Sequence, residues 1–297
     1  MKSRLALFTA AIIWGFAFVA QRKGMESVQP FTFNAVRFLV GCIALLPLMF
    51  INRRQDIHKS TSVKTIFFGG ALTGLVLFIA ASLQQIGLVY TSAGKAGFIT
   101  GLYVVLVPIM GLALQHRIGA WTWLGAFASI IGLYLLTITD TLTIEQGDLF
   151  LLAGAFFWTT HVHLVGYFSA RIGAIRLSLI QSAIVVIASL IVALSVETIR
   201  VEGLVDAALP ILFTGVLSIG VAYTLQIVGQ RNTPPSQAAI ILSLESVFAV
   251  IGGWLLLGES LPAKELIGCG LMFAGMTVSQ LDNELGLALQ SRATDET

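Results

Sequence analysis

Long apolar windows separated by short polar segments make up most of this chain. About 20 apolar residues are needed to cross roughly 30 Å of hydrocarbon. On that measure the pattern predicts ten membrane-spanning segments, at residues 5–21, 31–51, 65–86, 93–115, 119–138, 149–169, 175–196, 209–230, 236–257 and 263–281. The runs are continuous and do not alternate as barrel strands do, so we expect helices. The fold class predicted is an all-α integral membrane protein.

The first apolar run resembles a signal peptide, because Lys2 and Arg4 precede it. A cleavable signal needs small residues just after the run, yet Arg22, Lys23 and Glu26 stand there. We therefore expect this run to be the first transmembrane helix.

Composition agrees with a membrane protein. The chain is 57% hydrophobic and 11% charged, with a mean hydropathy of +0.91, whereas soluble domains have about 25% charged residues. A net charge of +2 from 17 basic and 15 acidic residues indicates no nucleic-acid partner. Cys42 and Cys269 both fall inside predicted spans, which argues against a disulfide framework.

The positions of the basic residues predict the topology. Ten spans place both termini on one side of the membrane, and the segments on that side carry most of the Lys and Arg residues. By the positive-inside rule both termini are expected in the cytoplasm. Residues 285–297 are expected to form a short cytoplasmic tail.

The chain also repeats itself. Trp14 recurs as Trp158 after 144 residues, and Gln84 recurs as Gln226 after 142. Residues 1–142 and 143–284 then form two five-helix repeats, and an odd number of spans inverts the second repeat. Inverted repeats are typical of secondary transporters, with the substrate site near the midplane between the halves.

Three stretches resemble a known family. They are WGFAFVAQRKG, TSAGKAGFITGLYVVLVPIMG and LESVFAVIGGWLLLGESLPAKELIGCGLMFAGM. They are similar to EamA-type members of the drug/metabolite transporter superfamily. The resemblance implies ten helices as two inverted five-helix repeats, and movement of small metabolites across the inner membrane. Ser246 departs from the pattern, since many relatives have proline there.

Among the charged residues within predicted spans, Arg37, Lys95 and Glu245 are the candidates for function, because a charge there costs about 2.5–3.5 kcal/mol. Lys95, near the start of its span, either reaches the interface or binds an anionic group of a substrate. Arg37 either binds a substrate carboxylate or clamps the structure. Glu245 lies nine residues after Ser236; it is protonated, paired with Lys95 or Arg37, or exposed to an aqueous cavity.

Aromatic and amide residues recur on single faces of several spans, an arrangement that suits an amphipathic organic solute. Simple helix packing is the alternative for each of them. Together with the three charges, the candidate substrate-binding residues are Trp14, Arg37, Gln84, Lys95, Tyr103, Trp158, His161, Tyr223, Gln226 and Glu245.

Sequence motifs for catalysis are missing: there is no HExxH, no GxSxG, and the Gly94–Lys95 pair lacks the rest of a phosphate loop. His161 and His163 point about 200° apart on a helix, which opposes a shared metal site. We therefore expect no enzyme activity, no metal and no cofactor.

The function predicted is a secondary transporter that works by alternating access, with a small-molecule substrate and the lipid bilayer as partners. The family resemblance implies an amino acid or similar metabolite, and the candidate residues favour a neutral or zwitterionic solute. Efflux is favoured, and a proton or another ion is a candidate for coupling. Two alternatives stay open: an uptake permease for a vitamin or nucleoside-like solute, and a non-transporting membrane scaffold or sensor. The oligomeric state is open, because a fused inverted repeat can form the whole pathway in one chain.

Overall fold

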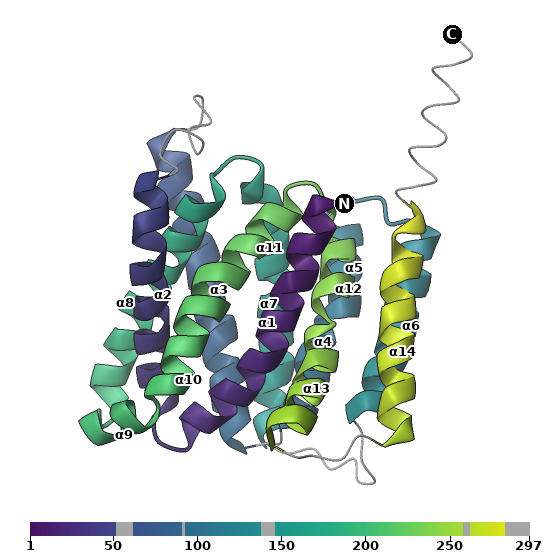
Figure 1. The fold of residues 1–297 in the computed structure, drawn as a ribbon. Coiled ribbons are helices and arrows are strands. Elements are labelled where there is room, and N and C mark those ends of the chain that lie inside the picture. The colour runs from purple at the N-terminus through teal and green to yellow at the C-terminus, as the bar shows by residue number, and fades with distance from the viewer. Residues whose placement is uncertain (52–61, 91–92, 138–145, 258–261, 283–297) are drawn as a thin grey trace.

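The computed structural model describes residues 1–51, 62–90, 93–137, 146–257 and 262–282. Within these ranges all regular structure is helical. The helices stand side by side in one bundle, with the N-terminus and the end of the last helix at the same end (Figure 1).

The helices of the first half are α1 (Lys2–Met25), α2 (Pro30–Ile51), α3 (Val63–Tyr90), α4 (Ala93–Gly101), α5 (Tyr103–Ala113) and α6 (Ala120–Thr137). Those of the second half are α7 (Gln146–Ser169), α8 (Ala174–Val196), α9 (Val201–Asp206), α10 (Ala208–Phe213), the π-helix η1 (Thr214–Ala222), α11 (Tyr223–Gln230), α12 (Pro235–Leu242), α13 (Glu245–Leu257) and α14 (Ala263–Ser279).

Membrane-spanning character follows from helix length and composition. Among the described residues, 7 stretches are long and apolar enough to cross a bilayer, and shorter apolar helices cover Ile99–Ala113 and Ala120–Leu135. The predicted all-α membrane class is thus confirmed. The number of ten spans remains a prediction, because several of the predicted segments are short or interrupted.

Two predicted spans are each built from two helices. The span 93–115 breaks at Leu102, whose carbonyl accepts from both Val105 N (3.0 Å) and Leu106 N (3.2 Å). Pro108 lies six residues on, inside α5; it lacks an N–H group, so the carbonyl of Val104, four residues before it, receives no helical hydrogen bond from that position. The span 236–257 breaks at residues 243–244, between α12 and α13.

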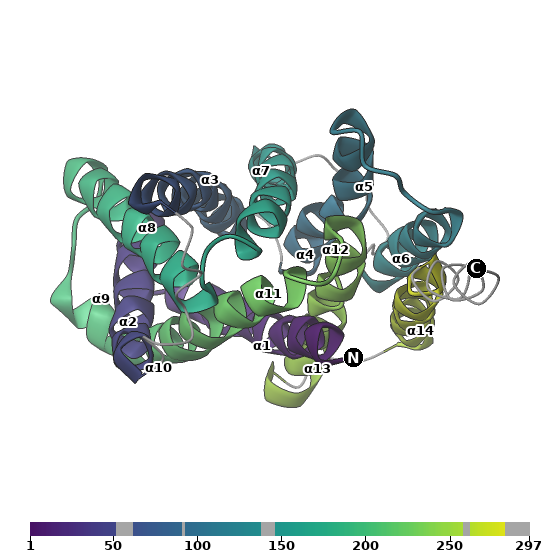
Figure 2. The ribbon, with the colours of Figure 1, turned by 90° about the horizontal axis from the view of Figure 1, so that it is seen from above.

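The bundle is elongated when seen along the helices (Figure 2). One end holds α6 and α14, the other holds α2, α3 and α8, and α1, α7, α11 and α12 lie between them. Glycines let α6 and α14 touch: a Cβ on Gly125 would lie 2.5 Å from the carbonyl oxygen of Gly275, and a Cβ on Gly275 would lie 2.6 Å from that of Gly125.

Carboxylates cap two helices across long sequence separations. Glu197, after α8, accepts from the backbone N–H groups of Phe31 (2.8 Å) and Thr32 (2.7 Å) at the start of α2. Asp282, after α14, accepts from the N–H (2.7 Å) and hydroxyl (2.6 Å) of Thr122 in α6. Both contacts satisfy donors at a helix N-terminus. They tie the ends of helices from different halves to each other.

Candidate functional site

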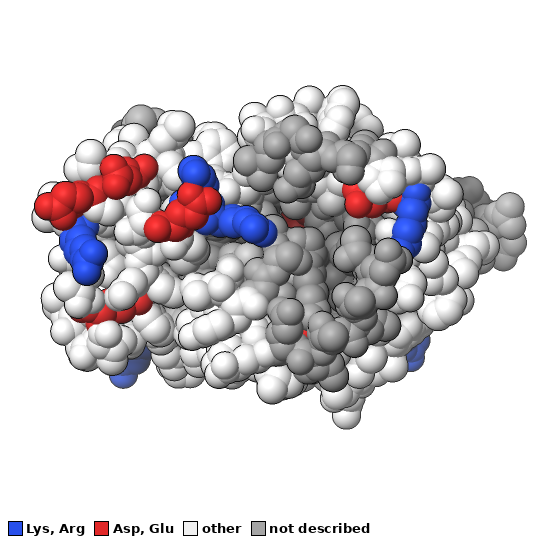
Figure 3. Space-filling model, turned by 90° about the horizontal axis from the view of Figure 1, so that it is seen from below, with Lys and Arg blue, Asp and Glu red and all other residues white. Residues whose placement is uncertain are grey.

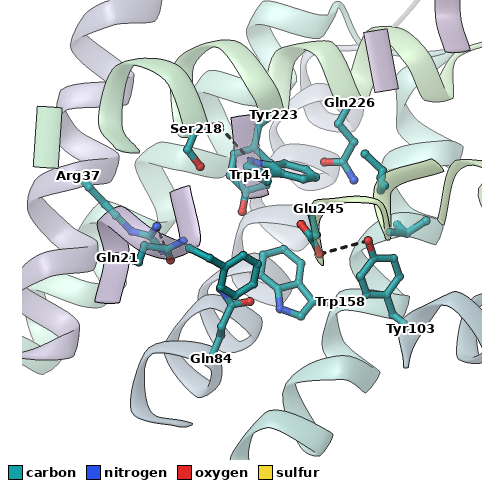
Figure 4. Close-up of a pocket in the computed structure, with 13 residues that line it drawn as sticks. Trp14, Gln21, Arg37, Gln84, Tyr103, Trp158, Ser218, Tyr223, Gln226 and Glu245 are labelled. Carbon is teal, nitrogen blue, oxygen red and sulfur yellow. Dashed lines mark hydrogen bonds between the residues drawn. The ribbon is translucent and has the colours of Figure 1, made fainter. Parts of the chain in front are cut away.

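A narrow cavity lies in the middle of the bundle, between the two halves (Figure 4). Its lining residues are Trp14, Phe18, Gln21, Arg37, Gln84, Tyr103, Trp158, Val162, Ser218, Tyr223, Gln226, Leu242 and Glu245. The centre of a water molecule has about 40 Å³ in which to move. Since one buried water needs roughly 10–15 Å³ on this measure, the cavity has room for about three waters. An organic solute would require the helices to open.

Arg37 stands at one end of the cavity and is 3% exposed. Its Nη1 donates to Gln21 Oε1 (2.8 Å), and its Nε donates to Asn34 Oδ1 (3.0 Å). The guanidinium carbon also lies 5.5 Å from the ring centroid of Phe33 and 5.2 Å from that of Phe38. Within the described part of the chain, its hydrogen-bond partners are neutral amides, so a buried positive charge faces the cavity without a carboxylate beside it.

Glu245 lies further along the cavity, between Arg37 and Tyr103 (Figure 4), and is 8% exposed. The hydroxyl of Tyr103 donates to its Oε1 at 3.3 Å. Glu245 is the first residue of α13, where the helix N-terminus favours a negative charge. Tyr103 likewise begins α5, and it precedes Glu245 by the same 142 residues that separate Gln84 from Gln226. The contact between Tyr103 and Glu245 therefore joins the first residues of α5 and α13, which occupy the same position in the two repeats.

An aromatic wall lies between Arg37 and Glu245 (Figure 4). The rings of Trp14 and Tyr223 meet edge to face with centroids 4.9 Å apart. The Trp14 indole Nε1 donates to the carbonyl of Ser218 at 3.4 Å, inside η1. Trp158, at the position equivalent to Trp14, also faces the cavity, and its indole nitrogen has no partner among the described residues. Aromatic faces and free amide or indole groups can hold the body of an organic solute.

His161 lies behind this wall and does not line the cavity. It is fully buried, its Nε2 is 3.2 Å from Gln181 Oε1, and its ring packs edge to face on Trp158 and Tyr223. Its geometry supports the wall and gives no direct contact with a solute. Burial against α8 explains this position, which helical spacing alone did not reveal.

Of the other predicted site residues, Trp14, Arg37, Gln84, Tyr103, Trp158, Tyr223, Gln226 and Glu245 all line the cavity. Lys95 belongs to α4, but its side chain lies outside the described part of the structure. Sequence reasoning left out Phe18, Gln21, Val162, Ser218 and Leu242 from the site. Phe18 and Gln21 share the helical face of Trp14, and Val162 follows Phe18 by the repeat distance of 144 residues, so these three carried a usable signal. Ser218 and Leu242 carried none.

The described residues contain no group of three His, Cys, Asp or Glu side chains that could hold a metal. His163 points away from His161 and places its Nε2 2.9 Å from the carbonyl oxygen of Val107.

A bundle of apolar helices around an internal cavity defines a multi-pass membrane protein. The model of the EamA-like transporter family matches residues 1–138 and 145–280. The chain belongs to this family, as the sequence resemblance predicted, and is a membrane transporter.

Relatives cover nearly the whole chain. A protein of Archaeoglobus fulgidus named as an uncharacterized transporter is 31% identical over 278 residues, which span 93% of this chain and 85% of the relative. The Escherichia coli strain K12 protein named uncharacterized inner membrane transporter YedA is 27% identical over 288 residues, 92% of this chain and 89% of the relative. A solved crystal structure superposes with a TM-score of 0.78 at 16% identity, covering 94% of this chain and 96% of that chain, so the two share a fold.

Proposed function

We propose that this protein is a secondary transporter of a small zwitterionic metabolite, such as an amino acid, and works by alternating access at the inner membrane. One observation carries the proposal: the cavity has a guanidinium at one end and a carboxyl group further along, and each group is hydrogen-bonded to neutral side chains instead of to the other. A zwitterion would give Arg37 a carboxylate and Glu245 an ammonium, which are better partners for these two groups than the neutral side chains that each contacts now.

The lining supports two equivalent halves, residues 1–142 and 143–284, with ten spans in an inverted five-plus-five arrangement. Both halves supply residues at matching positions, namely Trp14 with Trp158, Phe18 with Val162, Gln84 with Gln226, and Tyr103 with Glu245. Helix contacts between the halves are reciprocal: α3 of the first half packs on α7 and α8 of the second, while η1 packs on α1 and α2 of the first half and α11 packs on α1. A site shared by inverted repeats is what alternating access requires.

Surface charge supports cytoplasmic termini. The face opposite the N-terminus carries both signs of charge, gathered mainly towards one end (Figure 3). The described charged residues at this end of the bundle are Arg22, Lys23, Glu26, Asp148, Glu197, Arg200, Glu202, Asp206, Lys264 and Glu265. The N-terminal face carries Lys2, Arg4, Lys64, Arg117, Arg171, Arg176, Arg231 and Asp282. The excess of basic over acidic groups lies on the N-terminal face, as expected for the cytoplasmic side.

Energy for transport would come from the solute gradient or from an ion, and Glu245 is the acidic residue of the lining that can exchange a proton or an ammonium. We expect export as the net direction. Flux measured in proteoliposomes with and without a proton gradient tests both statements.

The decisive experiment is ligand-dependent thermal unfolding of the purified protein. The panel contains amino acids, vitamins, nucleosides and organic cations, and each zwitterion that responds is repeated as its amide and as its N-acetyl form. A ligand at 100 times its Kd adds about 2.7 kcal/mol to the unfolding free energy. The amide has no carboxylate, so we expect it to lose the stabilisation that depends on Arg37. The N-acetyl form has no ammonium, so we expect it to lose the stabilisation that depends on Glu245.

Arg37→Gln should then be stabilised equally by the parent solute and its amide, and Glu245→Gln equally by the parent solute and its N-acetyl form. Arg176→Gln is the matched control, since Arg176 lies outside the cavity. The proposal fails if no zwitterion stabilises the protein, or if the amide and N-acetyl forms bind as well as the parent solute.

A further inference from the structure

Two hydrogen bonds join the end of α11 to α7, in the part of the bundle nearer the N-terminus. The Gln230 side chain donates from Nε2 to the Val162 carbonyl (2.9 Å), and Arg231 donates from Nε to the Ser169 carbonyl (3.0 Å). Gln230 is buried. Each bond runs from a side chain to the backbone of another helix, so it is lost when α7 and α11 separate.

A third contact joins α7 to α5 at the same end. The carbonyl oxygen of Val107 can only accept, so His163 donates to it through Nε2–H. Close approach is also possible at Gly166, where an added Cβ would lie 2.9 Å from the Pro235 ring. The turn after α11 lies beside the start of α1, because the Asn232 amide donates to the Ser3 hydroxyl (3.3 Å).

The equivalent positions at the opposite end of the bundle lack these features. The repeat distances of 144 and 142 residues pair His163 with Val19, Gly166 with Arg22, Gln230 with Leu88 and Arg231 with Val89. Valine and leucine side chains donate no hydrogen bond, and arginine is bulky where glycine permits close contact. Among the described residues, the side-chain hydrogen bond between α3 and α1 at that end runs from Gln85 Nε2 to the Met25 sulfur, a weak acceptor, at 3.6 Å.

We propose that His163, Gln230 and Arg231 are gating residues that hold the path closed on the N-terminal side. The resting transporter therefore favours the state in which the cavity opens to the opposite side. In an inverted-repeat transporter the two end states exchange the conformations of the halves. A hydrogen bond that forms in one end state and has no equivalent in the other favours the first state. Each neutral hydrogen bond of this kind changes the ratio of the two populations by about fivefold. This inference rests on the proposed alternating access, and it adds which end is closed and which residues close it.

The test uses thiol labelling from each side of sealed vesicles. In a background with Cys42→Ser and Cys269→Ala, Ser218→Cys places one thiol in the cavity, and Lys2→Cys in a separate variant marks the N-terminal face. A membrane-impermeant maleimide is added to right-side-out or inverted vesicles. We expect the cavity thiol to react faster from the face opposite Lys2→Cys.

Gln230→Leu and His163→Val introduce the residues found at the equivalent positions of the first half. Each is expected to raise the labelling rate from the N-terminal face about fivefold relative to the rate from the other face. Thr160→Val is the matched control: its hydroxyl donates within α7, to Phe156 O at 3.0 Å, so its loss should leave the ratio unchanged.

Three results would overturn the gate. The parent protein would label equally from both faces or faster from the N-terminal face; the two variants would leave the ratio unchanged; or they would raise labelling equally from both faces, as general loosening does. The labelling needs no substrate, so these results remain readable even if the zwitterion proposal fails.

Discussion

Replacing Arg37 by glutamine should change the stability of the fold little and lower the affinity for the substrate strongly. The guanidinium donates to two neutral amide oxygens, those of Gln21 and Asn34, and has no carboxylate partner among the described residues. Hydrogen bonds that involve a charged group contribute roughly 1.5–3 kcal/mol each. Against this, taking an ion out of water costs several kcal/mol, which amides compensate less well than a carboxylate does.

These opposing terms nearly cancel, and glutamine can still donate to one of the two amides. We therefore expect Arg37→Gln to change the unfolding free energy by no more than about 1–2 kcal/mol, in either direction. The second repeat already carries glutamine at the matching position, Gln181, in a fully buried site. Substrate affinity should respond far more, because a charge-assisted contact of about 1.5–3 kcal/mol corresponds to roughly 10- to 150-fold in Kd.

The assay is thermal unfolding of the parent and variant, without ligand and across a titration of the best zwitterion from the panel. A midpoint shift of a few degrees without ligand, together with a large loss of affinity, supports a recognition role. Arg37→Lys, which keeps the charge but not the planar fork, should retain part of the affinity. Loss of more than about 3 kcal/mol of stability with unchanged affinity for the folded fraction would refute the reasoning and make Arg37 a structural clamp.

Tyr103→Phe removes the hydroxyl that donates to Glu245. In a binding titration it should change the binding free energy of the ammonium-bearing ligand by about 0.5–1.5 kcal/mol, and an unchanged Kd would exclude this contact from recognition. Gly125→Val places its Cβ 2.5 Å from the α14 backbone and should lower the unfolding free energy by about 1–3 kcal/mol in thermal unfolding. Gly270→Val is the control, because a Cβ there meets nothing within 4 Å, and equal effects of the two variants would contradict the argument. Asp282→Ala removes the cap of α6 and should cost about 1 kcal/mol in the same measurement, so an unchanged midpoint would show that the cap adds nothing.

Local sequence determined the membrane class and most of the cavity. Partition of an apolar run into hydrocarbon depends on that run alone, so hydropathy suffices to predict helices. The repeat distance then matched Trp14 with Trp158 and Gln84 with Gln226, and all four residues line the cavity. Within a helix, spacing also fixes which residues share a face.

Tertiary packing decided the contact partners of the candidate residues, which their spacing in the sequence leaves open. Tyr103 meets Glu245 because two interrupted helices cross near the bundle centre, and Arg37 is held by amides where an acidic partner was one expectation. His161 lies behind the aromatic wall because α8 covers it. Each of these outcomes depends on contacts between helices far apart in the chain, and hydrogen-bond partners at such separations are selected by how the helices pack rather than by local pattern.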